Sequence, residues 1–206
     1  MIEPRLTLLG LAVLLLAWAG PLPGLVPQSF AAHMALHMSV VGIGIPLLAA
    51  GLAPALAGAR VLKSQLALPI AVSLIDLVVV WGWHAPAPHH ASRESGLVLT
   101  VEQASFALVS LLVWLVALAG AGDRRRSAAL GGAMTLFFTS MHMTLLGALI
   151  GLAPRPIYGE HHASAMLPAL ADQQLGGVIM LAIGGVIYLA GGLVLMGRVL
   201  QRPVRP

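Results

Sequence analysis

The sequence contains no cysteine, and only 9% of its 206 residues are charged. Without cysteine there can be no disulfide bridge, thiolate metal site or thiol redox chemistry, so any soft metal ligand must be histidine or methionine. Soluble domains carry about 25% charged residues. The low charge, with 59% hydrophobic residues and a mean hydropathy of +0.94, therefore excludes a soluble globular protein. The 23 glycines and 14 prolines fit a polytopic membrane protein, because both residues are common in transmembrane helices.

Six segments are long and apolar enough to cross a bilayer, since a spanning helix needs about 20 mostly apolar residues. They are residues 6–23, 29–53, 66–83, 104–120, 128–152 and 174–196. The predicted fold class is an all-α membrane protein, a bundle of six transmembrane helices in a single domain, 1–206. The first segment also fits a cleaved signal peptide, because its apolar stretch is short, follows Arg5 and precedes the small residues Ala19 and Gly20.

The basic residues predict the orientation of this bundle. Of the 11 Lys and Arg residues, only Arg93 and Arg155 lie in the connections after the first, third and fifth spans. Because cytoplasmic connections are enriched in Lys and Arg, both termini are predicted to be cytoplasmic and those three connections to face outside. The run 124–126 is then an anchor on the cytoplasmic side, with anionic lipid binding as an alternative. The basic residues interrupt apolar runs instead of forming a solvated face, so no nucleic-acid partner is expected.

With this orientation of the six spans, every histidine falls in the outer half of the membrane or in an outer loop. The eight are His33, His37, His84, His89, His90, His142, His161 and His162. Polar side chains inside a bilayer are costly and usually face the bundle interior or a cavity, so the intramembrane histidines are candidates for function. The pairs 89–90 and 161–162 are predicted to be solvated, with capture of metal at an entrance as an alternative.

His33 and His37 are four residues apart, which places both imidazoles on one helix face where they can converge on one ion. Met34 and Met38 repeat this spacing on the adjoining face. These residues predict metal ligation, and the alternative is a pair of hydrogen-bonded core histidines beside methionines that only pack.

Helix rise, about 1.5 Å per residue, predicts two tiers of ligands. His37 and His142 lie at similar depth, and Asp76 can reach them from the third span, either as an oxygen ligand, as a group that orients an imidazole, or as a structural hydrogen-bond acceptor. His33, His84 and Asp172 would form an upper tier nearer the surface. Met141 and Met143 flank His142, and at most one of them can share its site, because consecutive helical residues point about 100° apart.

Imidazole and thioether donors without thiolates suit copper, and imidazole alone also suits zinc, iron or nickel. The methionines and the Irving–Williams order favour copper, as Cu(I). The sequence shows no motif for hydrolysis, phosphate binding or dinucleotide binding, and no nucleophile paired with a base. The chain is therefore predicted to be a metal carrier and not an enzyme.

Four short patches resemble the CtaG-type family of integral membrane assembly factors for caa-type cytochrome c oxidases. They are HMALHM (33–38), WHAP (83–86), His142 ahead of RPIY (155–158), and DQQLGG (172–177). The resemblance implies a bacterial inner-membrane protein that takes copper on its outer side, from an extracytoplasmic donor, and delivers it to the copper B centre of the oxidase catalytic subunit. It also implies that His33, His37, His84, His142 and Asp172 are the functional polar positions, with Gln173 and Gln174 beside them.

Three other functions remain open at this point. A b-type haem protein would ligate iron through histidines on facing helices, and His37 and His142 permit this. A metal permease would carry polar residues through both halves of the membrane, and here the cytoplasmic halves are nearly free of them. A structural membrane subunit would bind no metal tightly.

Overall fold

The computed structural model describes residues 1–56, 67–118, 125–159 and 167–200, and these ranges contain helices and no strand. The helices are α1 (Pro4–Ala19), α2 (Leu22–Leu25), α3 (Phe30–Met38), α4 (Ile45–Leu56), α5 (Ala67–Trp83), α6 (Pro86–Glu94), α7 (Gly96–Leu118), α8 (Arg125–Gly151) and α9 (Ala169–Leu200), and a π-helix, η1 (Ser39–Gly44), joins α3 to α4. The predicted all-helical class is confirmed.

Five helical stretches are long and apolar enough to cross a membrane, and α5 with α6 makes a sixth if this bent pair is one span. The five are Pro4–Leu25, Phe30–Leu56, Gly96–Leu118, Ala128–Gly151 and Ala169–Leu200. This agrees with the six predicted segments, with one difference of consequence. The fourth predicted segment begins at residue 104, whereas α7 begins at Gly96, so the polar residues Glu102 and Gln103 lie inside a spanning helix.

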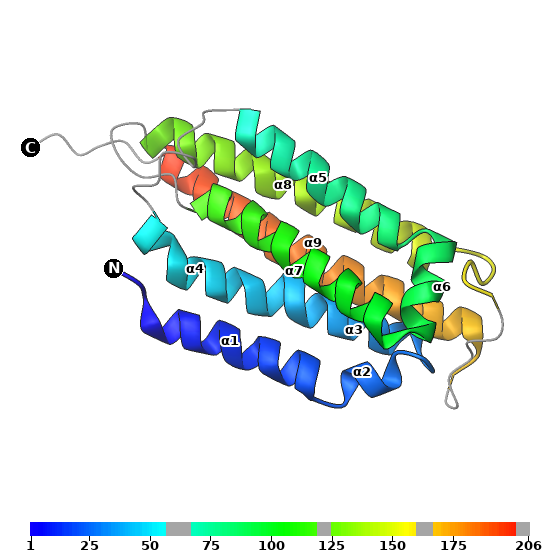
Figure 1. Ribbon diagram of the computed structural model, residues 1–206. Coiled ribbons are helices and arrows are strands. Elements are labelled where there is room, and N and C mark those ends of the chain that lie inside the picture. Colours follow the sequence, from blue (N-terminus) through cyan, green and yellow to red (C-terminus); the bar gives the residue numbers. More distant parts are fainter. Residues whose placement is uncertain (57–66, 119–124, 160–166, 201–206) are drawn as a thin grey trace, which may run out of the picture.

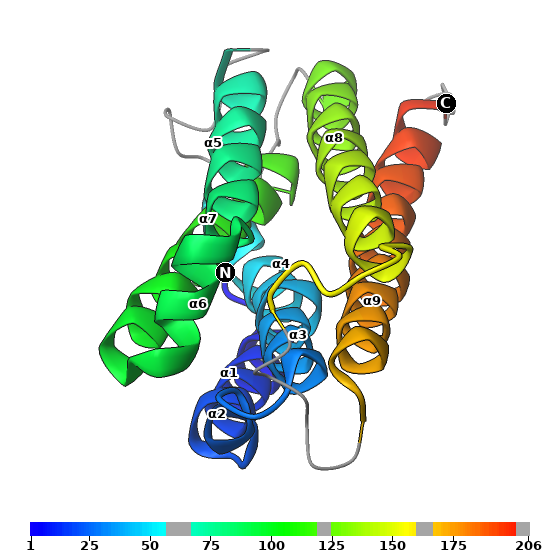
Figure 2. The same ribbon diagram turned by 90° about the vertical axis from the view of Figure 1, so that its right-hand side faces the viewer.

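The long helices run side by side, and the N-terminus and the C-terminal end of α9 lie at the same end of the bundle (Figure 1). An even number of crossings produces this arrangement. The opposite end carries α2, α6 and the connection from α8 towards α9, and Figure 2 looks directly at it. We call it the polar end, because the buried histidines described below lie there.

The π-helix η1 interrupts the second span directly after His37 and Met38. Such wide turns leave backbone carbonyls without their usual helical partners and are frequent at functional sites. Here the Val41 carbonyl accepts hydrogen bonds from the Tyr188 hydroxyl of α9, at 3.2 Å, and from Ser110 Oγ of α7, at 3.4 Å. Both neighbouring helices therefore hold the interruption in place.

Helices α8 and α9 pack closely because glycines face each other across their interface. A Cβ built on Gly177 would lie 2.6 Å from Gly151 Cα and 2.8 Å from the Gly147 carbonyl oxygen. Membrane helices associate without a hydrophobic driving force between them and depend on such close approach of backbones. The glycines thus fix the position of α9, whose first turn reaches the polar end.

Candidate metal centre

A proline begins the short helix α6. Ala85 is extended, as the residue before a proline prefers to be, and Pro86 occupies the first turn of α6, where its missing N–H costs nothing. The axis of α6 turns by 69° from that of α5. The helix therefore lies across the polar end and directs His89 into the bundle, where only 1% of this residue is exposed. The prediction that His89 is solvated is wrong for this reason.

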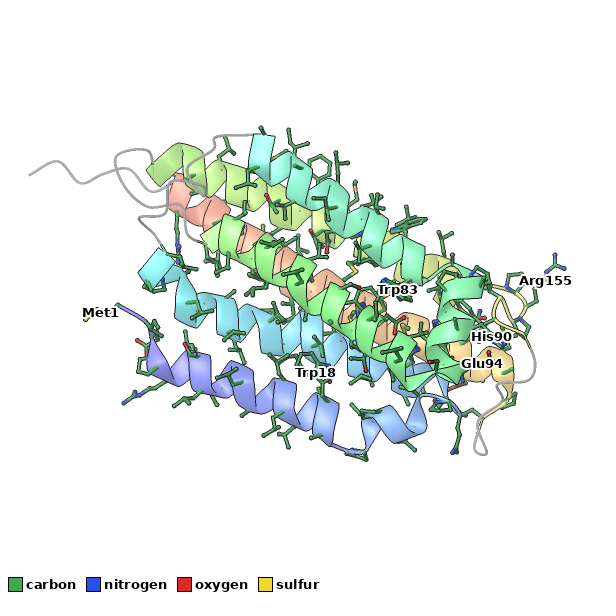
Figure 3. The ribbon with its side chains drawn as sticks, in the orientation of Figure 1. Met1, Trp18, Trp83, His90, Glu94 and Arg155 are labelled. Atoms are coloured by element: carbon green, nitrogen blue, oxygen red, sulfur yellow. The ribbon has the colours of Figure 1, made fainter. Side chains whose placement is uncertain are left out.

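The prediction that His90 is solvated is confirmed, because its side chain is half exposed and lies 3.1 Å from Glu94 on the outside of α6 (Figure 3).

Three buried side chains from three helices converge on one point at the polar end: His33 of α3, His89 of α6 and Glu102 of α7. One potential ligand atom from each lies within 4.8 Å of the others. His33 Nε2 donates to Glu102 Oε2 at 2.7 Å, and the rings of His33 and His89 stack with their centres 4.8 Å apart. We call this group the outer centre. Two imidazoles and a carboxylate form a donor set that suits copper, zinc or iron.

Glu102 places a carboxylate in an almost wholly buried position, at 1% exposure. Its oxygens accept from Ser92 Oγ, at 3.2 Å, and Gln103 Nε2, at 3.5 Å, as well as from His33. Among the described residues His33 is the only side chain that forms an ion pair with Glu102, and no described Lys or Arg does so. A carboxylate buried in a bilayer needs a compensating positive charge. The outer centre can obtain that charge from a proton on His33 or from a bound cation.

One turn further along α3, His37 is completely buried and lies beside His84 and Phe106. The ring centres are 5.5 Å apart for His37 and His84 and 4.1 Å apart for His37 and Phe106. His84 Nδ1 donates to the Val80 carbonyl at 2.7 Å, which leaves Nε2 as the nitrogen with the lone pair. The tiers predicted from depth are therefore composed differently, with His33 beside His89 and His37 beside His84.

Asp76 and His142 form a separate pair between α5 and α8. His142 Nε2 donates to Asp76 Oδ2 at 2.9 Å, and Thr139 Oγ1 donates to the same oxygen at 3.3 Å. The contact agrees with the depth at which both were placed from the sequence. Asp76 fixes the imidazole tautomer, as carboxylates commonly do for metal-binding histidines, and His142 Nδ1 has no hydrogen-bond partner among the described residues.

Asp172, predicted as an upper-tier ligand, instead occupies the N-terminus of α3. Its carboxylate accepts from the Phe30 backbone N–H at 2.6 Å, from the Ala31 N–H at 3.2 Å and from Ser29 Oγ at 2.7 Å. These are donors that the first turn of a helix otherwise leaves unsatisfied. Asp172 therefore ties α9 to the start of α3, the helix that carries His33 and His37.

Substituting Asp172 by alanine is expected to destabilise the protein by about 2 kcal/mol or more, because buried backbone N–H groups would lose their acceptor. Thermal unfolding in detergent measures this effect. The Ser29→Ala variant is the comparison, since it removes the hydroxyl that accepts from the Ala32 N–H and donates to Asp172 but leaves the Asp172 carboxylate on the Phe30 and Ala31 N–H groups, at a cost of about 1 kcal/mol. Equal melting temperatures for the Asp172→Ala variant and the native chain would contradict the capping role.

Residues 6–202 match the sequence model of the cytochrome c oxidase caa3 assembly factor family. The chain belongs to this family. No curated protein and no solved structure gives a significant match. The match covers nearly the whole chain, so it supports the resemblance seen in the four patches, and it identifies a membrane protein that acts in oxidase assembly.

In this family member the four patches meet at the polar end through hydrogen bonds. Tyr158 of the third patch donates its hydroxyl to the His84 carbonyl of the second at 3.0 Å. Gln173 of the fourth accepts from the Ile157 N–H of the third at 2.6 Å, and Asp172 caps the helix of the first. Short motifs that are far apart in the sequence thus form one structure around the histidines.

Aromatic side chains pack against His89 of the outer centre. Tyr158 packs against His89 and Phe30, with ring centres 4.4 and 4.8 Å apart. Burial raises the pKa of the Tyr158 hydroxyl above its ordinary value, so it stays protonated and donates to the His84 carbonyl. Arg93, one turn after His89 on the same buried face of α6, donates from its guanidinium to the carbonyls of Val26 and Pro27.

The predicted methionine ligands face away from the histidines. Met34 and Met38 point towards α9, where they lie against Gly176 and Gly184, and Met143 also packs against Gly184. Met141 is 60% exposed on the outer surface of α8. The imidazoles lie on the adjoining face of α3, because each histidine precedes a methionine by one residue and consecutive helical residues point about 100° apart. The two histidines at 161–162 lie outside the described residues.

Proposed function

We propose that this assembly factor binds copper at the outer centre and hands it to the copper B centre of the oxidase catalytic subunit. The observation that carries the proposal is the buried group of His33, His89 and Glu102, which holds a carboxylate near imidazole nitrogens and in which no described Lys or Arg pairs with that carboxylate. Copper is the cargo favoured by the family's role in oxidase assembly and by its place at the top of the Irving–Williams order. The protein is a carrier with no catalytic step of its own.

We further propose that the polar end faces the outer side of the bacterial plasma membrane and that the termini are cytoplasmic. The distribution of basic residues supports this orientation. An acceptor centre buried in the membrane is best served by a donor that holds its ion at similar depth, and an extracytoplasmic copper donor would load the outer centre from that side. The chain acts as one domain, anchored in lipid, whose partner is the oxidase subunit.

His37, His84 and His142, with Asp76 behind His142, complete the proposed ligand set below the outer centre. Copper would move between them by ligand exchange, each new imidazole displacing an old one. The methionines at 34, 38, 141 and 143 are not required for this path, because those at 34, 38 and 143 pack towards α9 and the one at 141 is exposed. Asp172 supports the path by holding α3.

Cells in which the His33→Ala variant replaces the native protein are expected to assemble oxidase subunits without copper at the copper B centre. The native gene should restore the metal. Copper and haem in the purified oxidase are the readout, and oxidase copper content is expected to fall about tenfold or more, since disturbing even the outer-shell partner of a metal ligand costs about 10- to 100-fold in metal affinity or activity.

The matched control is His90→Ala, which changes a histidine on the exterior of α6 next to Glu94. It should restore oxidase copper as well as the native gene does. A normal copper content in the His33→Ala cells would refute the proposed function.

A further inference from the structure

We propose that His37 and His84 form a second, inner site that binds a single monovalent copper ion between two imidazole nitrogens. This inference deepens the proposed function and rests on it, because it names the oxidation state of the cargo and the ligands of its second position. It is separate from the outer centre, whose donor set includes a carboxylate.

The first observation is that His37 is wholly buried, and neither of its ring nitrogens has a hydrogen-bond partner among the residues the structure describes. A neutral imidazole carries one N–H donor and one lone pair. Leaving such groups unsatisfied in an apolar interior costs about 1–3 kcal/mol each. Buried polar atoms of this kind are rare in folded proteins, and an ion is one of the few things that accounts for them.

The second observation is that His84 is prepared to bind through one defined nitrogen. Its Nδ1 donates to the Val80 carbonyl within the same helix, so the lone pair lies on Nε2, which has no partner among the described side chains and main chain. Metal-binding histidines characteristically donate their second nitrogen to a carbonyl or carboxylate, which fixes both tautomer and ring orientation. His84 is 6% exposed and points into the bundle from the junction of α5 and α6.

The distance between the two rings fits one bridging ion. Their centres are 5.5 Å apart, with an angle of 58° between the ring planes. Two imidazoles on opposite sides of an ion, with bonds of about 2 Å, have ring centres about 6 Å apart. Phe106 lies against both rings, at 4.1 and 5.9 Å from His37 and His84, and gives the position an apolar wall.

The surroundings favour a monovalent ion over a divalent one. The buried carboxylate of Glu102 is already bonded to His33, Ser92 and Gln103. The two imidazoles of the inner site are neutral donors and add no negative charge of their own, and the cost of burying an ion rises with the square of its charge. Cu(I) accepts few and soft ligands, whereas Zn²⁺ is better served by the mixed set of the outer centre. The inner site lies about one helical turn, or about 5 Å, below it along α3.

The experiment titrates the purified full chain in detergent with Ag⁺, a redox-inert stand-in for Cu(I), and separately with Zn²⁺. His37→Leu is expected to weaken Ag⁺ binding by about 100-fold and to leave Zn²⁺ binding unchanged, since it removes a direct ligand of the inner site alone. Glu102→Gln should do the reverse. X-ray absorption at the silver edge of the native protein should show two nitrogen neighbours, which separates this site from binding by methionine sulfur.

His84→Gln is a second variant with the same expected result, in case His37→Leu lowers the yield of folded protein, and His90→Ala should change neither titration. Unchanged Ag⁺ binding in both His37→Leu and His84→Gln, or an equal loss of Ag⁺ and Zn²⁺ in both, would overturn the inner site. These outcomes are independent of the oxidase copper content in His33→Ala cells, so failure of the inner site and failure of the proposed function can be told apart.

Discussion

Replacing Gly177 by alanine is expected to lower the free energy of unfolding by about 3 kcal/mol, near the upper end of the usual cost of overpacking. The new methyl group would meet the backbone of Gly151 and the carbonyl of Gly147 on α8. Backbone atoms cannot turn aside as a flexible side chain can, so α8 and α9 would have to separate. Unfolding in mixed detergent micelles, followed by tryptophan fluorescence, measures the loss.

Gly197 provides the matched control on the same helix. A Cβ built there meets no atom of the described residues within 4 Å. Gly197→Ala should therefore leave stability unchanged or raise it by up to about 1 kcal/mol through better helix propensity. Equal effects of the two substitutions would show that the close approach of α8 and α9 does not limit stability.

Replacing Asp76 by leucine is expected to cost about 3–5 kcal/mol, because breaking a buried pair leaves the other partner unsatisfied. His142 Nε2 and Thr139 Oγ1 would both lose their acceptor. The same unfolding assay detects the change. The double variant Asp76→Leu/His142→Leu should recover part of the lost stability, since no imidazole would then remain without its partner.

Asp76→Asn tests which property of Asp76 matters. The amide oxygen can still accept from His142, so this variant should retain most of the stability that the leucine variant loses. If asparagine and leucine were equally destabilising, the negative charge and not the hydrogen bond would be responsible for holding α5 against α8.

The sequence predicted the helical class and the spans well, because long apolar runs leave few alternatives in a bilayer. It placed the start of the fourth span too late, at residue 104, since Glu102 and Gln103 read as the end of a polar connection. In the structure both residues are buried in α7. Glu102 lies two residues before the predicted start of the span, and this closeness was the available sign that it belongs to the helix. A spanning helix can include such an acidic residue when neighbouring helices cover its side chain.

The candidate site was predicted in part. Five predicted residues are buried towards the polar end of the bundle, as their spacing and depth indicated: His33, His37, His84, His142 and Asp76. Their pairing was not predictable, because depth along straight helices says nothing of which face turns towards which neighbour. His89 was missed because the 69° bend that follows Pro86 turns a segment that reads as an outer loop back over the bundle.

The position of Asp172 has an electrostatic consequence for an ion at the outer centre. The N-terminus of a helix carries about half a unit of positive charge, which repels a cation. His33 lies in the first turn of α3, so an ion bound there would sit close to this positive pole. The Asp172 carboxylate at the same helix end offsets this positive pole, while the guanidinium of Arg93, whose charge interacts with that of Asp172, acts in the opposite direction. A residue that touches no ion thereby helps to set how strongly the protein holds its cargo and how readily it gives that cargo up.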